Sequence, residues 1–233
     1  MKVLVVDVGG THVKVGLGGQ RKPVVLDSGP HLTAGRMAEE VRRATEGWNY
    51  DAVSIGYPGP VVNGRPAREP KNLGAGWVRF DYDRAFRKPV RVVNDAAMQA
   101  LGSYQGGRML FLGLGTGLGS ALVADGVVEP LELAHLPYRK GRTFEDYVGQ
   151  RGLRRMGRKR WTRHVEMVVA MLKDALQADY VMLGGGQTKK LKALPPGVRL
   201  GDNARAITGG QRLWEQPSGR APRLSMPKGR RPR

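Results

Sequence analysis

The chain has 233 residues, of which 40% are hydrophobic, enough for one large domain or two modest ones with a real core. It has no cysteine, which excludes disulfides, thiolate metal sites and a cysteine nucleophile. Its formal net charge of +19 favours contact with polyanions, although solubility explains such a charge equally well. The chain opens on a strand-like run and has no apolar run near the ~20 residues of a membrane helix, so we expect a cytoplasmic protein without membrane contact.

The first half of the chain predicts buried strands and two helices. Apolar or alternating residues predict strands at 2–8, 13–17, 24–26, 52–56 and 90–93. Thr33 is a typical N-cap for a helix that runs to about Glu46. A second helix is predicted at 96–102, directly after the polar pair Asn94-Asp95.

The second half begins in the same way as the first. Strands are predicted at 108–114, 120–124, 127–128 and 180–183, and helices at 144–156, 161–178 and about 204–214. Residues 217–233 are rich in Pro, Gly and Arg and predict a disordered basic tail. Because a strand, a glycine turn and a returning strand open both halves, the sequence predicts two related α/β lobes with a hinge near 105–108.

Glycine turns follow three of the predicted strands. They contain Gly9, Gly10 and Thr11; Gly115, Thr116 and Gly117; and Gly184, Gly185 and Gly186. Backbone N–H groups in such turns can cradle phosphate oxygens, because no Cβ keeps the anion away. None of the turns is a Walker A loop or a dinucleotide fingerprint. One such turn alone is usually structural, but three together predict a phosphate site.

Two aspartates follow buried strands. Asp7 precedes the first glycine turn and is suited to hold Mg²⁺, directly or through water, although a turn aspartate that bonds its own backbone is the simpler alternative. Asp95 could take a proton from an attacking hydroxyl while Asn94 bonds another hydroxyl of the same sugar. Both residues are equally good helix N-caps, so their local sequence leaves the two interpretations open.

Glu132 and His135 stand close together after Pro130. A carboxylate and an imidazole at this spacing can both bond sugar hydroxyls. A lone histidine is usually incidental, and no paired Cys/His spacing indicates a metal here.

These pieces together resemble the ROK-family sugar kinases. The ordered motifs, which cover about residues 1–214, are Val6-Asp7-Val8-Gly9-Gly10-Thr11, Gly56-Tyr57-Pro58-Gly59, Asn94-Asp95-Ala96, Leu114 to Gly119, Glu132-Leu133-Ala134-His135 and Gly184-Gly185-Gly186. The chain is most similar to the polyphosphate-glucokinase branch. The residues that carry this closer similarity are Thr11 and Lys14, Asn72 and Trp77, Glu145-Asp146-Tyr147, and the run from Gly184 to Lys190.

The resemblance implies an actin-like (ribonuclease H-like) α/β fold of two lobes with a sugar cleft between them. Residues 1–106, joined by a C-terminal helix at about 203–216, would form the small lobe and 107–202 the large lobe. Asp95 would be the catalytic base, and a homodimer would be typical. Sugar would be held by Asn94, Asp95, Glu132, His135 and Glu145. Phosphate, nucleotide or Mg²⁺ would lie at Asp7, Gly9, Gly10, Thr11, Lys14, Gly115, Thr116, Gly117, Gly184, Gly185 and Gly186.

The chain departs from the family pattern at three places. It lacks the cysteine-rich zinc motif of many members, so no zinc is expected. Ala134 replaces the usual glycine before His135 and could tilt the imidazole. The stretch between Gly186 and the last helix is short, which would reduce the wall around an adenine.

The positive charge is concentrated in two segments. Between Arg139 and Arg163, ten Arg and Lys residues oppose two acidic residues, a balance of +8, and residues 217–233 carry six basic residues and no acid. Together with this charge, the resemblance implies a kinase that moves the terminal phosphoryl group of ATP or polyphosphate to a hexose hydroxyl, such as the 6-OH of glucose. Two alternatives are an inactive sugar-responsive binding protein and a nucleic-acid binder, although the basic segments lack the aromatic residues on which bases stack. The sequence leaves the sugar, the donor and the oligomeric state open.

Overall fold

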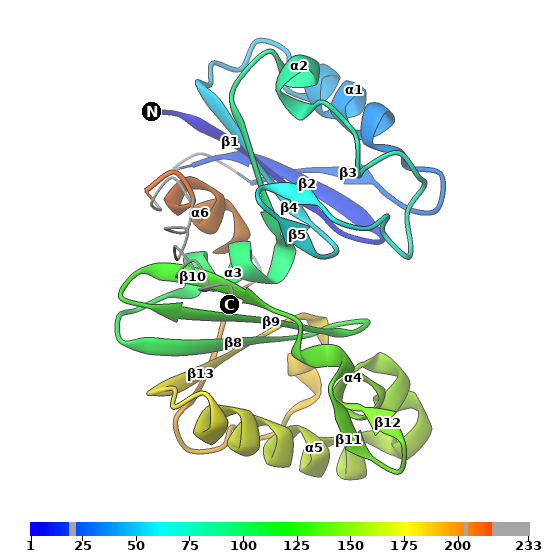
Figure 1. Ribbon diagram of the computed structural model, residues 1–233, viewed down its shortest axis with the longest axis vertical. Coiled ribbons are helices and arrows are strands. Elements are labelled where there is room, and N and C mark those ends of the chain that lie inside the picture. The colour runs from blue at the N-terminus through cyan, green and yellow to red at the C-terminus, as the bar shows by residue number, and fades with distance from the viewer. Residues whose placement is uncertain (19–21, 203–204, 216–233) are drawn as a thin grey trace, which may run out of the picture.

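The computed structural model describes residues 1–18, 22–202 and 205–215, in which two five-stranded sheets lie one above the other (Figure 1). The tail predicted at 217–233 lies outside the described residues, as do 203–204 and 216 of the predicted C-terminal helix. None of the described helices combines the length and the apolar character needed to cross a membrane.

The first sheet has the strand order β3-β2-β1-β4-β7. Its strands are β1 (Val3–Val8), β2 (His12–Leu17), β3 (Val24–Asp27), β4 (Ala52–Tyr57) and β7 (Val90–Asn94). The pairs β1-β2 and β2-β3 are antiparallel, whereas β1-β4 and β4-β7 are parallel. The carboxyl ends of β1, β4 and β7 therefore meet at one edge of the sheet.

The second sheet repeats this topology, with the order β10-β9-β8-β13-β14. Its strands are β8 (Arg108–Leu114), β9 (Leu118–Ala124), β10 (Val127–Leu131), β13 (Tyr180–Gly184) and β14 (Val198–Leu200). The echo that the sequence predicts between the two halves is thus present in the fold. Two small ladders, β5 (Val61–Val62) with β6 (Arg65–Pro66) and β11 (Pro137–Arg139) with β12 (Arg142–Thr143), are additional.

Helices lie outside and between the sheets (Figure 1). Those in the described residues are α1 (Ala34–Ala44), α2 (Tyr82–Phe86), α3 (Asp95–Ser103), α4 (Phe144–Val148), α5 (Gln150–Ala175) and α6 (Arg205–Arg212), with the 3₁₀ turns η1 (Leu133–His135) and η2 (Gly186–Lys190). Helices α1 and α2 cover the outer face of the first sheet, α4 and α5 cover the outer face of the second, and α3 and α6 fill the space between them.

Within one strand, successive residues contribute to different layers of the core. In β1, Leu4 and Val6 belong to the outer core of the first sheet, whereas Val3 and Val5 face the middle layer. In β8, Leu110 faces the outer core of the second sheet and its neighbours face the middle layer. Side chains of successive strand residues point to opposite faces, so both sheets are buried on both sides.

Helices α3 and α6 cross at glycines. A Cβ on Gly102 would overlap the Arg205 carbonyl, and a Cβ on Gly209 would overlap the Met98 carbonyl. The hydroxyl of Ser54 on β4 donates to the Gly210 carbonyl at 2.6 Å. The last described helix is therefore packed into the junction between the two sheets.

The structure corrects the predicted helices at 144–156 and 161–178. The first break comes at Gly149, where a Cβ would press on the Thr116 and Glu145 carbonyls. The predicted boundary between 156 and 161 is present, because Gly157 has the non-helical dihedral angles φ 72° and ψ 162° and divides α5 into two helical segments, the second of which ends at Ala175. Helix α2, strand β14 and the two small ladders were not predicted, since each is too short for a periodic pattern.

Candidate active site

Two aspartates lie at the carboxyl edge of the first sheet. Asp7 is the penultimate residue of β1, is buried with 9% exposure, and pairs in register with Gly56 of β4 on one side and Lys14 of β2 on the other. Asp95 is the first residue of α3 and directly follows β7. Parallel strands bring their carboxyl ends to one edge, where ligands of α/β sheets bind.

The negative charges of Asp7 and Glu132 both act on Asp95. The pKa of Asp95 is raised to about 7, first by burial and then by the negative charges of Asp7 and Glu132, against the lowering effect of the Ala96 N–H. The pKa of Asp7 is raised to about 6 by burial, against the lowering effect of the Lys14 ammonium. Glu132 comes from the second sheet, so the cluster is assembled from both lobes.

Asn94 is the N-cap of α3. Its Oδ1 accepts the N–H groups of Ala96 at 3.0 Å and Ala97 at 3.3 Å, and its Nδ2 donates to the Gly59 carbonyl at 3.0 Å. The capping interpretation left open by the sequence is thus the one that the structure shows. Among the residues that the structure describes, no partner engages the second N–H of the Asn94 amide.

The first glycine turn joins β1 to β2 beside Asp7. The Gly9 N–H donates to the His12 carbonyl at 3.0 Å, which makes the turn tight. A Cβ on Gly10 would lie 3.6 Å from the Asn72 side chain, so the 72–77 loop approaches this turn closely.

The second and third glycine turns lie next to each other in the structure. The Gly115 N–H donates to the Gly117 carbonyl at 3.1 Å between β8 and β9. Gly185 has a φ of 86°, and a Cβ there would overlap the backbone of Leu114, the residue before the second turn. The structure therefore brings these two turns together, although they are 70 residues apart in the chain.

Glu145 of α4 lies against the second turn. Its Oε2 accepts the Leu118 N–H at 3.3 Å, its Oε1 accepts from Arg151 at 3.4 Å, and a Cβ on Gly117 would overlap its carboxylate. Helix α4 also packs against η1, which contains His135. Glu145 thus stands between the glycine turn and the Glu132–His135 segment.

The backbone of the segment from Glu132 to His135 is fixed by the buried side chain of Ala134 and by the hydroxyl of Ser120. Ala134 is buried in the core of the second lobe, whereas Glu132 and His135 on either side of it are exposed. Ser120, which the sequence analysis did not single out, donates its hydroxyl to the Leu131 carbonyl at 2.8 Å and accepts the Leu133 N–H at 3.2 Å. Ser120 is 2% exposed, and its sequence carries no signal that distinguishes it from other polar strand residues.

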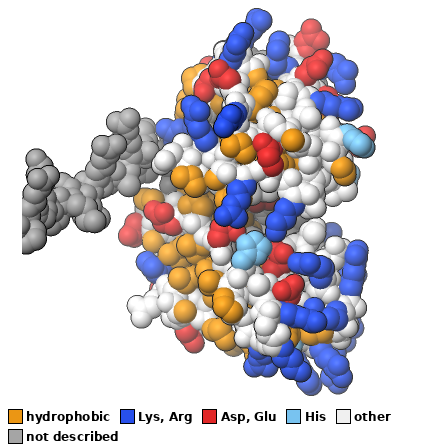
Figure 2. Space-filling model, turned by 45° about the vertical axis from the view of Figure 1, so that its right-hand side comes forward, with side chains coloured by type: hydrophobic (Ala, Val, Ile, Leu, Met, Phe, Trp, Pro, Cys, Tyr) orange, Lys and Arg blue, Asp and Glu red, His pale blue; other side chains and the backbone are white. Residues whose placement is uncertain are grey.

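The surface around this region carries charges of both signs. Figure 2 shows an indentation where the upper and lower parts of the molecule meet, with acidic and basic side chains at its rim. Lys and Arg side chains gather over the lower part, where α4 and α5 lie. The described residues contain no group of three or more His, Cys, Asp or Glu side chains that could hold a metal alone.

Sequence comparison identifies two curated relatives. A glucokinase of Pyrobaculum calidifontis is 29% identical over 136 residues, which are 54% of this chain and 45% of that protein. A polyphosphate glucokinase of Mycobacterium leprae is 24% identical over 209 residues, 79% of this chain and 63% of that protein. The matched part thus covers less than two thirds of either relative. No protein-family profile matches the chain.

Structural comparison identifies the fold. The inorganic polyphosphate/ATP-glucomannokinase of Arthrobacter sp. strain KM has a TM-score of 0.73 at 21% identity, over 92% of this chain and 99% of that one. A ROK-family glucokinase of Streptomyces griseus, solved with glucose and AMPPNP, has a TM-score of 0.75 at 17% identity, over 91% and 99%. The predicted two-lobed fold of the ROK sugar kinases is therefore confirmed.

Proposed function

We propose that the protein is a sugar kinase that transfers the terminal phosphoryl group of ATP or polyphosphate to a hexose hydroxyl, with the 6-OH of glucose as the first candidate. The observation that carries the proposal is Asp95, a half-buried carboxyl with a pKa of about 7 in a cluster with Asp7 and Glu132. The names of both curated relatives, a glucokinase and a polyphosphate glucokinase, support it. Both donors and the hexose would meet in the cytoplasm, which is the location that we propose.

Asp95 is the general base in this proposal. A base works best when its pKa lies near the working pH, because it is then both ionised and able to accept a proton. Phosphoryl transfer has a loose transition state, so Asp95 mainly orients the attacking hydroxyl and takes its proton as the bond to phosphorus forms.

The second lobe contributes most sugar ligands. We assign Glu132 and His135, both exposed above the buried Ala134, to neighbouring hydroxyls, with Glu145 beside them. Asn94 contributes only the amide N–H that its capping bonds leave over. The predicted lobes, 1–106 with the C-terminal helix and 107–202, would close on the sugar between them.

The donor phosphates would meet the glycine turns at Gly9–Thr11, at Gly115–Gly117 and at Gly184–Gly186, with Lys14 beside the first. Mg²⁺ fits the cluster, because it prefers one or two carboxylates together with substrate phosphates and water. Asp7 is suited to hold it, since the negative charges of the buried Asp7 and the exposed Glu132 raise the pKa of Asp95 and a cation would relieve this repulsion. When bound, the ion would neutralise charge on the phosphoryl oxygens.

Polyphosphate as donor is supported by the position of the basic segment, defined as Arg139–Arg163. Arg151 of this segment contacts Glu145, which in turn accepts an N–H of the second glycine turn. Arg151 therefore places the middle of the basic segment next to the turn assigned to the transferred phosphate. A linear polyanion that leaves this turn would pass directly onto arginine side chains, whose planar donors match phosphate oxygens.

The function is tested by an activity matrix of ATP and polyphosphate against glucose, mannose and N-acetylglucosamine, with Mg²⁺ present. We expect phosphorylation of at least one sugar. Sugar binding by calorimetry without turnover by either donor would instead indicate the inactive binding protein. A salt-sensitive shift of DNA without sugar binding would indicate the nucleic-acid binder.

Activity is expected to depend on pH through Asp95. The base must be ionised, and burial raises its pKa to about 7, so kcat/KM for the sugar should fall about tenfold per pH unit below this value. The measurement is kcat/KM from pH 5.5 to 9 at a saturating donor concentration. Asp7→Asn should move the midpoint of the remaining activity to lower pH, because the Asp7 charge raises the pKa of Asp95. A flat profile would remove Asp95 from the base role.

His135→Ala is expected to raise the sugar KM roughly 10- to 100-fold, because the sugar hydroxyl assigned to the imidazole would lose its hydrogen-bond partner. The donor KM should stay unchanged. His31→Ala is the matched control, since His31 is an exposed histidine of the first lobe. An unaltered sugar KM would show that His135 is structural and that Ala134 has turned it away from the sugar.

A further inference from the structure

Ser28 lies where β3 ends beside the first glycine turn. Its N–H donates to the Thr11 carbonyl at 3.1 Å, which extends the β2-β3 ladder one step past the pair His12–Asp27. Its hydroxyl crosses to the Gly9 carbonyl and donates to it at 2.6 Å. A single residue thus holds two carbonyl groups of the turn.

The peptide between Gly9 and Gly10 is oriented by this second bond. A peptide unit is planar and trans, so its N–H points opposite to its carbonyl. Because Ser28 holds the Gly9 carbonyl, the Gly10 N–H is directed away from Ser28. No hydrogen bond among the described residues engages the Gly10 N–H, so this donor is left for an anion.

Glycine neighbours make the serine necessary for this orientation. Gly9 and Gly10 have no Cβ to restrict their dihedral angles, so a peptide between them rotates more readily than any other. The Gly9 N–H is fixed on its other side by the His12 carbonyl. The remaining freedom lies in the Gly9–Gly10 peptide, and within the described part of the chain the Ser28 hydroxyl is the one hydrogen-bond partner of that peptide.

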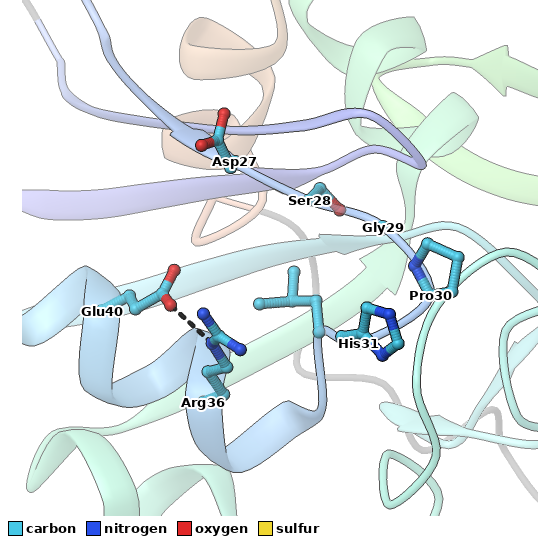
Figure 3. A pocket seen from close by; sticks show the side chains of 8 residues that line it. Asp27, Ser28, Gly29, Pro30, His31, Arg36 and Glu40 are labelled. Atoms are coloured by element: carbon cyan, nitrogen blue, oxygen red, sulfur yellow. Dashed lines mark hydrogen bonds and ion pairs between the residues drawn. The ribbon is translucent and has the colours of Figure 1, made fainter.

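The loop that carries Ser28 is anchored independently. The Leu32 N–H donates to the Gly29 carbonyl at 2.9 Å, and the Gly74 N–H donates to the Leu32 carbonyl at 3.1 Å. Leu32 itself is 5% exposed and belongs to the core of the first lobe. On one side the loop faces a cavity of about 220 Å³, bounded by the Arg36–Glu40 ion pair of α1 (Figure 3).

We propose that Ser28 is a positioning residue of the phosphate site, which sets the direction of the Gly10 N–H so that it meets a phosphate oxygen of the donor. The proposal rests on the proposed kinase function. Ser28 touches no reacting atom and acts through the Gly9–Gly10 peptide alone.

Ser28→Ala should lower kcat/KM for the donor by about 10- to 100-fold, the loss expected for one hydrogen bond to a charged group. The sugar KM should stay within about twofold of wild type. Ser28→Thr keeps the hydroxyl and should restore most of the activity. Thr33→Ala is the control, since Thr33 caps α1 on the same loop by accepting the Arg36 N–H at 3.2 Å and does not touch the glycine turn.

A second readout needs no turnover. Amide exchange and chemical shift of Gly10, measured by NMR on the full chain without donor, should change in Ser28→Ala and not in Thr33→Ala. If the wild type phosphorylates no sugar, the kinase proposal fails, while these amide signals still test Ser28. Equal losses in the Ser28 and Thr33 variants, or an unchanged Gly10 signal in Ser28→Ala, would overturn the positioning role.

Discussion

Asp95→Asn is expected to lower kcat by about 10²- to 10⁴-fold, the contribution typical of general-base catalysis. Asparagine keeps the size of the side chain and its ability to start α3, but it cannot accept a proton. Sugar affinity should stay close to that of the wild type, because the amide still bonds a hydroxyl. The measurement is steady-state kinetics with each donor, together with sugar binding by calorimetry.

The fold should survive this substitution. The folded-state pKa of Asp95 is about 7, above the ordinary 3.8, so the folded protein retains a proton that the unfolded chain releases. The free energy of unfolding contributed by this group is therefore highest at low pH and falls as pH rises from about 4 to 7. Asparagine carries no charge and removes this cost, so the variant should melt no lower than the wild type at pH 8.

Asp81→Asn is the matched control for this experiment. Asp81 also stands at the start of a helix, where its carboxylate accepts the Arg84 N–H at 3.0 Å, but it is exposed and lies outside the carboxylate cluster. It should leave kcat unchanged. Retention of more than about a tenth of the wild-type kcat by Asp95→Asn would show that another group takes the proton.

The positions of Asp7 and Asp95 could be predicted because they depend on local pattern. Each follows an apolar strand at the point where the periodicity ends, and the two strands are parallel members of one sheet. The convergence of their ends follows from sheet geometry alone. The repeated order of strands was predictable for the same reason, since the two halves open with the same strand–turn–strand pattern.

Contacts set by tertiary packing could not be predicted in this way. The meeting of Glu145 with Gly117, 28 residues apart, depends on how α4 settles on the second sheet. The break at Gly149 has the same origin, because the helical pattern continues through it and the carbonyls of Glu145 and Thr116 leave no room for a side chain. Ser28 and Ser120 likewise look like ordinary polar residues until their hydrogen-bond partners are known.

Asn94 shows why a motif alone does not fix a role. Its sequence position suits both a sugar ligand and a helix cap, and both readings need the residue to follow a strand. The structure shows the cap, with three hydrogen bonds to Ala96, Ala97 and Gly59. A residue already bonded in this way is well oriented, so the single N–H that remains has a fixed direction.

Polyphosphate-dependent activity is expected to fall steeply with salt if the basic segment binds the donor. Each contact between a basic side chain and a phosphate releases a counterion, and for single-stranded polyanions the logarithmic slope is about 0.7 per contact. Four contacts would lower kcat/KM for polyphosphate about 50-fold between roughly 50 and 200 mM salt. ATP, with about two such contacts, would lose only about 7-fold over the same range.

Two double variants distinguish polyphosphate binding by the basic segment from a general effect of the protein's positive charge. Arg154→Ala with Arg158→Ala removes two exposed arginines of α5, and Arg42→Ala with Arg43→Ala removes two exposed arginines of α1 in the other lobe. Only the first pair should reduce the salt slope for polyphosphate, by about 1.4, because two contacts are lost. Robust ATP activity with none from polyphosphate at 50 mM salt would refute the polyphosphate donor. Equal salt slopes of kcat/KM for polyphosphate in the two double variants would show that polyphosphate, if it is used, does not lie along α5 beyond the second glycine turn.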